Sequence, residues 1–263
     1  MVVGITGPPG AGKSTLVDQL AKILRRQHKT VGIIAVDPSS PYTRGAILGD
    51  RIRMLDHHDD PGVFVRSMAT RGRLGGIART TLEMSMLFDA AGRDVVIIET
   101  VGVGQDEIEI ASLADITVVV LVPGFGDDVQ AIKAGIMEVA DLFAINKSDL
   151  PGADKLEQEI RAMQSLGSED QRVNSAPLRR VVAADGSGLE DLLTVIEELF
   201  AKRQRRSART ETWAARLREM LRDSLMTSLP EHEIVSYARR VAAKEEDPYT
   251  AVDALMHILR DCP

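Results

Sequence analysis

The chain has 263 residues, of which 44% are apolar and only 3% aromatic, so it is long enough to bury a sizeable core and poor in rings that could stack on bases. Its 32 basic and 39 acidic residues give a net charge of −7, which argues against a nucleic-acid partner. A lone cysteine, Cys262, the lack of a cleavable leader and the lack of any apolar run near ~18 residues predict a cytoplasmic protein without a membrane partner.

Short runs rich in β-branched residues alternate with longer segments of helical periodicity. Strands are predicted at Val2–Thr6, Val31–Val36, Val95–Glu99, Thr117–Leu121 and Leu142–Ile145, with a weaker candidate at Val181–Ala184. A helix is predicted to begin at Lys13, because Leu16, Leu20 and Leu24 recur at helical spacing. This alternation is typical of an α/β fold with a mostly parallel central sheet flanked by helices.

The last part of the chain has a different pattern. A predicted helix from about Gly188 to Arg206 closes the sheet domain, and it runs into a basic stretch at residues 202–209. Purely helical periodicity follows at Trp213–Leu229, Glu231–Lys244 and Asp247–Leu259. We therefore expect a domain over residues 1–206 and a C-terminal helical segment over 207–263.

Between the first strand and the first helix the sequence fits the phosphate-loop pattern G-x-x-x-x-G-K-[ST]. Curled backbone amides and a helix N-terminus suit a nucleotide phosphate, a lysine adds a cation, and the following hydroxyl suits Mg²⁺. The alternative is a glycine-rich turn that matches by chance. The predicted phosphate-binding residues are Gly7, Pro9, Gly10, Ala11, Gly12, Lys13, Ser14 and Thr15.

A second motif, Asn146-Lys147-Ser148-Asp149, follows the strand Leu142–Ile145 and matches the N-K-x-D signature of GTPases. One carboxylate, that of Asp149, can accept both N1–H and N2–H₂ of guanine, and adenine offers no such pair. Many GTPases add a Ser-Ala-x loop, and this chain has Val182-Ala183-Ala184 there. We expect Asn146, Lys147 and Asp149 to read guanine, with a backbone contact from Ala183 or Ala184, so that GTP or GDP is the bound nucleotide.

Acidic residues at strand ends are candidates for a Mg²⁺ site. Glu99 ends an apolar strand, and Gly102 follows at a spacing that suits a contact with the γ-phosphate. Asp37 and Asp50 are further candidates, for which the alternatives are a turn cap and a solvated acid. Val103 stands where many GTPases have a glutamine, so we expect slow intrinsic hydrolysis that a partner accelerates, unless Gln105 substitutes.

Two further segments are open to two interpretations each. Residues 66–79 combine four arginines with three glycines, which suits either a mobile loop that meets phosphate, acyl-CoA or a partner, or a solvated connection. Residues 123–128 form a predicted loop that leads to Gln130 and Lys133, which are either surface residues or part of a switch. The adjacent His57 and His58 are interpreted as a solvated helix end rather than a metal site.

Together these motifs resemble the MeaB/ArgK-type GTPases, the methylmalonyl-CoA mutase-associated G-protein chaperones of the SIMIBI class of P-loop proteins. The resemblance covers nearly all of residues 1–200. It rests on Gly7–Thr15, Val36–Met54, Glu99–Gln105 and Pro123–Gly135, which runs on to Asn146–Asp149.

The resemblance implies a homodimeric, Mg²⁺-dependent GTPase chaperone that docks on an adenosylcobalamin-dependent acyl-CoA mutase, where GTP binding and hydrolysis gate cofactor loading and protection. It implies a Mg²⁺ site of Ser14, Asp37, Asp50 and Glu99, and a third switch in which Asp127, Gln130 and Lys133 relay the nucleotide state. The C-terminal helices would supply the dimer contact. The implied catalytic residues are Lys13, Asp37, Glu99, Gly102 and Lys133.

One departure and two alternatives remain. Family members usually carry a helical extension ahead of the phosphate loop, whereas here the first predicted strand begins at Val2, so contacts made by that extension are not carried over. The alternatives are an ATP-dependent kinase or transport-associated ATPase, against which Asp149 argues, and a metal-insertion GTPase, against which the scattered histidines and the lone cysteine argue.

Overall fold

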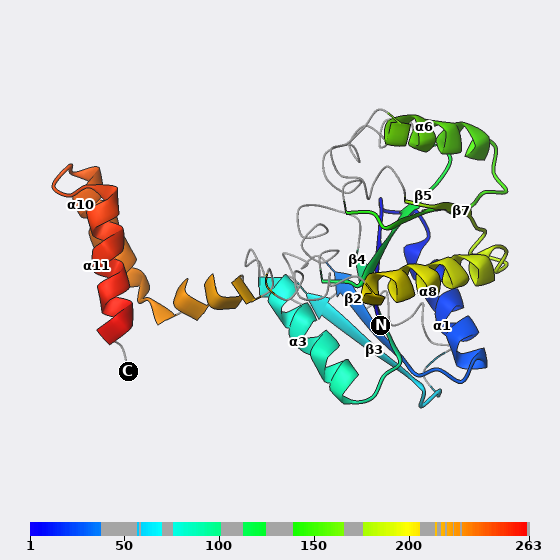
Figure 1. The fold of residues 1–263 in the computed structure, drawn as a ribbon, viewed down its shortest axis with the longest axis horizontal. Coiled ribbons are helices and arrows are strands. Elements are labelled where there is room, and N and C mark those ends of the chain that lie inside the picture. Colours follow the sequence, from blue (N-terminus) through cyan, green and yellow to red (C-terminus); the bar gives the residue numbers. More distant parts are fainter. Residues whose placement is uncertain are drawn as a thin grey trace. The chain divides into compact units, whose positions relative to one another are not determined.

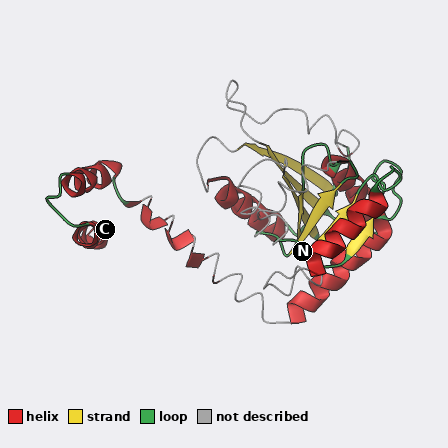
Figure 2. Ribbon diagram, turned by 90° about the horizontal axis from the view of Figure 1, so that it is seen from above, coloured by secondary structure: helices red, strands yellow, loops and turns green. Residues whose placement is uncertain are grey.

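The computed structural model describes residues 1–37, 57, 59–69, 76–100, 113–124, 139–165, 176–205, 214, 217–218, 220–222, 224–226 and 228–261. The chain divides into two compact units, Met1–Lys202 and Arg203–Pro263. The first contains a twisted sheet with helices packed against it, and the second contains helices (Figures 1 and 2).

The first unit is built on a seven-stranded parallel sheet of order β3-β2-β4-β1-β5-β6-β7. The strands are β1 (Val2–Thr6), β2 (Val31–Asp37), β3 (Val63–Ala69), β4 (Val95–Thr100), β5 (Ile116–Leu121), β6 (Leu142–Ile145) and β7 (Leu178–Arg180). Among the described residues, the helices that pack on this sheet are α1 (Lys13–Arg26), α3 (Gly76–Ala90), α6 (Ala153–Ser165) and α8 (Leu189–Arg205).

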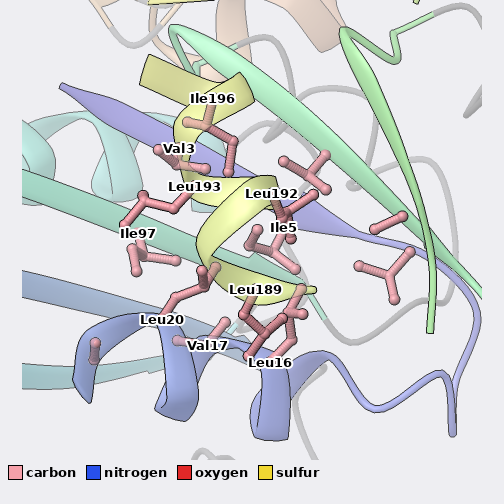
Figure 3. Close-up of a cluster of buried hydrophobic side chains, with 14 of the residues drawn as sticks. Val3, Ile5, Leu16, Val17, Leu20, Ile97, Leu189, Leu192, Leu193 and Ile196 are labelled. Atoms are coloured by element: carbon pink, nitrogen blue, oxygen red, sulfur yellow. The ribbon is translucent and has the colours of Figure 1, made fainter. Parts of the chain in front are cut away.

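Helices cover both faces of the sheet, because the central strands are apolar on both sides. On one face, the apolar stripes of α1 and α8 pack on alternate residues of β1 and β4, and Figure 3 shows Leu16 and Leu20 of α1 with Leu192 of α8 beside Ile5 and Ile97. The intervening residues point to the opposite face, where α3 packs on the strands around Ile34 and Ile98 and α6 packs on Phe143. The α/β class and the parallel sheet expected from the sequence are confirmed.

Most predicted strands lie within one residue of the observed ones, but the prediction at Val181–Ala184 is wrong. The observed edge strand β7 pairs Leu178, Arg179 and Arg180 with β6. The ladder stops there because β6 itself ends at Ile145, whose carbonyl accepts the last bond from the amide of Val181 at 2.9 Å. Beyond that point the chain turns back on the carbonyl of Val182.

Two further sequence interpretations need correction. The first four residues of segment 66–79 belong to edge strand β3 and residues 76–79 begin α3, while residues 70–75 lie outside the described part. His57 is not a solvated helix end: it is 6% exposed, and its Nε2 lies 2.8 Å from the Asp18 carboxylate on α1. His58 lies outside the described residues.

The second unit contains α10 (Glu231–Ala242) and α11 (Pro248–Asp261), which pack against each other. Asp247 caps α11 by accepting hydrogen bonds from the amides of Tyr249 and Thr250. None of the helices in the described residues combines the length and apolar character needed to cross a bilayer. Large apolar side chains exposed in this unit are Leu217, Met220, Leu221, Leu225, Met226, Val235, Tyr249, Val252 and Met256.

A cluster of charges joins α6 to the edge strand β7. Glu157 on α6 accepts hydrogen bonds from Arg161 on the same helix at 2.7 Å and from Arg180 on β7 at 2.7 Å. Hydrogen bonds from Arg161 and then Arg180 lower the pKa of the Glu157 carboxyl below its ordinary 4.5. Folding therefore favours the ionised carboxylate of Glu157, and the Glu157–Arg180 pair fixes β7 against α6.

We expect Glu157→Gln to weaken the acid sensitivity of the fold. Because folding lowers the pKa of Glu157, its contribution to stability is complete above the unfolded value of 4.5 and is lost as the pH falls through the lower folded value. Urea unfolding at neutral pH and below pH 4.5 should show a smaller loss for the variant than for the unaltered chain. The control is Glu159→Gln on the same helix, where the carboxylate of Glu159 lies 3.8 Å from the ammonium of Lys155; equal acid sensitivity in all three proteins would contradict the assignment.

Candidate nucleotide-binding site

The phosphate loop leaves β1 at the middle of the sheet and enters α1 at Lys13. Gly7 has a φ of 140°, and a Cβ there would lie 2.1 Å from the carbonyl oxygen of Val120 on β5. Gly12 has a φ of 83°, and a Cβ there would lie 2.4 Å from the Asn146 amide nitrogen. The loop lies so close to β5 and to the residue after β6 that only glycine fits at these two positions.

Lys13 is the first residue of α1 and is only 6% exposed. Its ammonium donates to the carbonyl oxygens of Gly7 at 2.6 Å and of Pro8 at 2.9 Å. The Lys13 side chain thus folds back over the phosphate loop, beside the first backbone amides of α1. A buried cation beside a helix N-terminus favours an anion at this place.

Ser14 and Glu99 bring two oxygen ligands together from different elements. The Ser14 hydroxyl donates to the carboxylate of Glu99, at the end of β4, at 2.6 Å, and Glu99 is 5% exposed. This donor set fits Mg²⁺, which takes one or two protein oxygens and completes its shell with water and phosphate. Among the described residues, no three His, Cys, Asp or Glu side chains gather in a metal-binding arrangement. A site built wholly from protein side chains would need such a group.

Asn146 joins the phosphate loop to the base motif. Its side chain is 1% exposed, donates to the carbonyl of Ala11 at 2.8 Å and accepts from the amide of Ala183 at 2.9 Å. Its own amide donates to the carbonyl of Leu121 at the end of β5. Residues 135 positions apart in the chain are thereby held at one edge of the sheet.

The rest of the base motif lies in a tight turn on the same edge. Lys147 has a φ of 54°, and its ammonium donates to the carbonyl of Gly10 at 3.0 Å, so its stem crosses toward the phosphate loop. Ser148 anchors the turn through its amide and its hydroxyl, which both donate to Val181. Asp149 is exposed, as a side chain that receives a ligand from solvent must be.

The structure brings most predicted site residues together. Pro9, Gly10, Thr15 and Ala184 are exposed and Ala11 is fully buried at this edge. Asp37 ends β2, the neighbour of β4, but its side chain lies outside the described part. The remaining predicted residues, namely Asp50, Gly102, Asp127, Gln130 and Lys133, also lie outside the described residues.

A polar pair next to the site was not predicted from the sequence. Thr6 and Thr100 end the adjacent strands β1 and β4, and the hydroxyl of Thr100 donates to that of Thr6 at 3.0 Å. A threonine closing each of two apolar strands was visible in the sequence. The pairing itself required the strand order, which places β4 rather than β2 beside β1.

The sequence of this chain is similar to those of known proteins. A sequence model of the family described as methylmalonyl Co-A mutase-associated GTPase MeaB matches residues 1–235. A Pyrococcus abyssi protein whose name describes it as a GTPase is 46% identical over 97% of this chain and 82% of its own length. GTPase ArgK of Escherichia coli is 50% identical over 56% of this chain and 44% of its own length. The Mus musculus protein named methylmalonic aciduria type A homolog, mitochondrial, is 39% identical over 74% of this chain and 48% of its own length.

Solved structures share the fold. The structure titled LAO/AO transport system kinase matches with a TM-score of 0.69 and 26% identity, over 99% of this chain and 82% of that one. HypB from Helicobacter pylori in complex with nickel matches with a TM-score of 0.54 and 21% identity, over 76% and 87% of the two chains, which concerns the fold alone. The P-loop NTPase architecture expected from the sequence is confirmed.

We expect Asn146→Ala to destabilise the first unit by about 1–3 kcal/mol, because it leaves the buried amide of Ala183 without its acceptor and the carbonyl of Ala11 without its donor. Urea unfolding of the nucleotide-free chain measures the change. Ser148→Ala in the same turn is the control: it removes a single partly buried bond to Val181 and should change the unfolding free energy by less. An Asn146→Ala chain as stable as the control would contradict the bridging role.

Proposed function

Because this chain belongs to the MeaB family of methylmalonyl-CoA mutase-associated GTPases, we propose that it docks on an adenosylcobalamin-dependent acyl-CoA mutase and uses GTP to gate the loading and protection of the mutase's cofactor. The observation that carries the nucleotide site is the Asn146 side chain, which places the base motif against the phosphate loop. GTP hydrolysis is the chemistry of the family, and we propose the following roles for individual residues.

Lys13 and the loop amides hold the nucleotide phosphates. The Lys13 ammonium exchanges the carbonyls of Gly7 and Pro8 for β- and γ-phosphate oxygens, which carry full charge and therefore accept more strongly. Gly10, Ala11, Gly12 and Thr15 contribute backbone or hydroxyl donors from the same loop and the first turn of α1, and Pro9 shapes its exposed tip.

Ser14 and Glu99 hold the Mg²⁺ that accompanies the nucleotide. When bound there, the ion neutralises phosphate charge during transfer to water. Glu99 is buried and its carboxylate already faces the hydroxyl of Ser14, so little rearrangement of these ligands is needed. Asp37 and Asp50 complete our proposed set of acidic groups around the ion, and Gly102 contacts the γ-phosphate.

Asp149 selects guanine by accepting its two adjacent N–H groups. The amide of Ala183 is already used by Asn146, so the neighbouring amide of Ala184 is our candidate donor to the guanine carbonyl oxygen. The Lys147 stem, which extends toward Gly10, lies along the base. This arrangement favours GTP over ATP and therefore argues against a kinase that uses ATP.

We predict that Asp149→Asn exchanges base preference. An asparagine amide keeps a single acceptor and gains a donor, which suits the carbonyl at position 2 of xanthine instead of the amino group of guanine. Competition binding with GDP, XDP and ADP should show a loss of GDP affinity of tenfold or more, about 1.4 kcal/mol or above, and a gain for XDP. The matched control is Asp185→Asn in the neighbouring turn, where the carboxylate accepts from Ser187. Unchanged preference for GDP in Asp149→Asn would contradict the role of this carboxylate.

The C-terminal helices supply the contact of a proposed homodimer. Helix α10 has no buried residue within its own unit, and apolar side chains such as Met226, Val235 and Val252 are exposed. Exposed large apolar side chains in such number favour a surface that a partner covers. We therefore place the subunit contact in residues 207–263.

Docking on a mutase is tested by retention from an extract of the source cells. The chain loaded with a non-hydrolysable GTP analogue should retain a cobalamin-dependent mutase, and Lys13→Ala, which cannot hold the nucleotide in the proposed site, should retain less. Adding the purified mutase should also accelerate single-turnover GTP hydrolysis, because Val103 cannot orient the attacking water. Fast hydrolysis without any partner, or equal retention by both proteins, would contradict the proposal.

A further inference from the structure

Two buried threonine hydroxyls, which the mechanism above does not use, join the ends of β1 and β4. Thr6 and Thr100 are 1% and 4% exposed, and the hydroxyl of Thr100 donates to that of Thr6 at 3.0 Å. The register of the two strands pairs Ile5 with Glu99, so the threonines follow as the next residues on each strand. The hydrogen bond therefore joins the last residue of β1 to the last residue of β4.

The hydroxyl pair orients the two strand ends relative to each other and adds little net stability to the fold. The strand residues that precede it, such as Ile5 and Ile98, are buried and apolar. When both partners of a buried hydrogen bond are replaced by apolar groups of the same shape, stability changes little, and valine has the shape of threonine. What the hydroxyls add is a fixed distance and orientation between two strand ends, since a hydrogen bond is directional and an apolar contact is not.

The two strand ends carry the two halves of the proposed metal site. Thr6 directly precedes Gly7, where the phosphate loop that bears Ser14 begins, and Thr100 directly follows Glu99. Side chains alternate along a strand, so Thr100 and Glu99 point to opposite faces of the sheet. The end of β4 is thus held on one face by Thr6 and on the other by the Ser14 hydroxyl, at 2.6 Å from the carboxylate.

We propose that the Thr6–Thr100 hydroxyl pair is a positioning element that sets Glu99 against Ser14 and so determines the affinity of the site for Mg²⁺. The inference rests on the proposed function, since it assumes that Ser14 and Glu99 hold the ion. Neither threonine touches the nucleotide in this account. Each acts through its neighbour in the chain, Thr6 through the phosphate loop and Thr100 through the backbone of Glu99.

The test uses the full chain and three variants: Thr100→Val, which removes a hydroxyl and keeps the shape; Thr100→Ser, which keeps a hydroxyl; and the double variant Thr6→Val/Thr100→Val. GDP affinity is measured in EDTA and across a Mg²⁺ titration, and kcat and KM for GTP are measured at saturating Mg²⁺. For Thr100→Val we expect metal-free GDP affinity to change less than about twofold, and the half-saturating Mg²⁺ concentration to rise about tenfold, as for other groups that orient metal ligands. A fall in kcat with little change in KM should accompany it, and Thr100→Ser should behave as the unaltered chain.

The double variant and thermal unfolding separate positioning from folding. The double variant should shift the Mg²⁺ titration no further than Thr100→Val, because both changes remove the same bond, and its unfolding temperature should stay close to that of the unaltered chain. Wild-type Mg²⁺ dependence in Thr100→Val would overturn the inference, as would metal-free GDP affinity lost in parallel. An unaltered chain that binds no GDP would refute the proposed function, and this inference with it. If the unaltered chain binds GDP normally, the Mg²⁺ dependence of the threonine variants tests this inference alone.

Discussion

One buried side-chain amide determines how the proposed site is assembled. Asn146 bonds to the phosphate loop at Ala11 and to the amide of Ala183, so segments from the first, sixth and seventh strands meet at one point. The amide lies so close that residue 12 has no room for a Cβ. In the proposed site, phosphate binding and base binding are therefore coupled, because a shift of either loop breaks the buried hydrogen bond that joins them.

The sheet supplies the frame for that bridge. All of its strands are parallel, so their carboxyl ends lie at one edge, where open α/β sheets bind ligands. The order of the strands places β4 on one side of β1, and β5 followed by β6 on the other, which brings Glu99 to one side of the phosphate loop and Asn146 to the other. Lys13, folded over the carbonyls of Gly7 and Pro8, keeps its cation at the loop without exposing it to solvent.

The sequence predicted the elements and motifs of this site, because each depends on local pattern: β-branched runs for β1 and β6, and glycine spacing for the loop. It failed where the outcome depends on distant neighbours. Val182 and Ala183 look like strand residues, but β6 ends too early to pair with them. Edge strand β3 was not predicted, and its residues from Arg66 onward fell in the segment interpreted as a loop or a solvated connection, since its exposed Phe64 and Arg66 obscure the apolar alternation. Burial of His57 depends on Asp18, 39 residues earlier, which no local pattern reveals.

We propose that the loop over which Lys13 folds binds the phosphates of a guanine nucleotide. Isothermal titration calorimetry of GDP in the presence of Mg²⁺, on the unaltered chain and on Lys13→Ala, tests it most directly. We predict saturable, one-to-one heat for the unaltered chain and none measurable for the variant, because the alanine removes the cation that would bind the phosphates. Equal GDP affinity in the two proteins, or no heat from the unaltered chain, would contradict it.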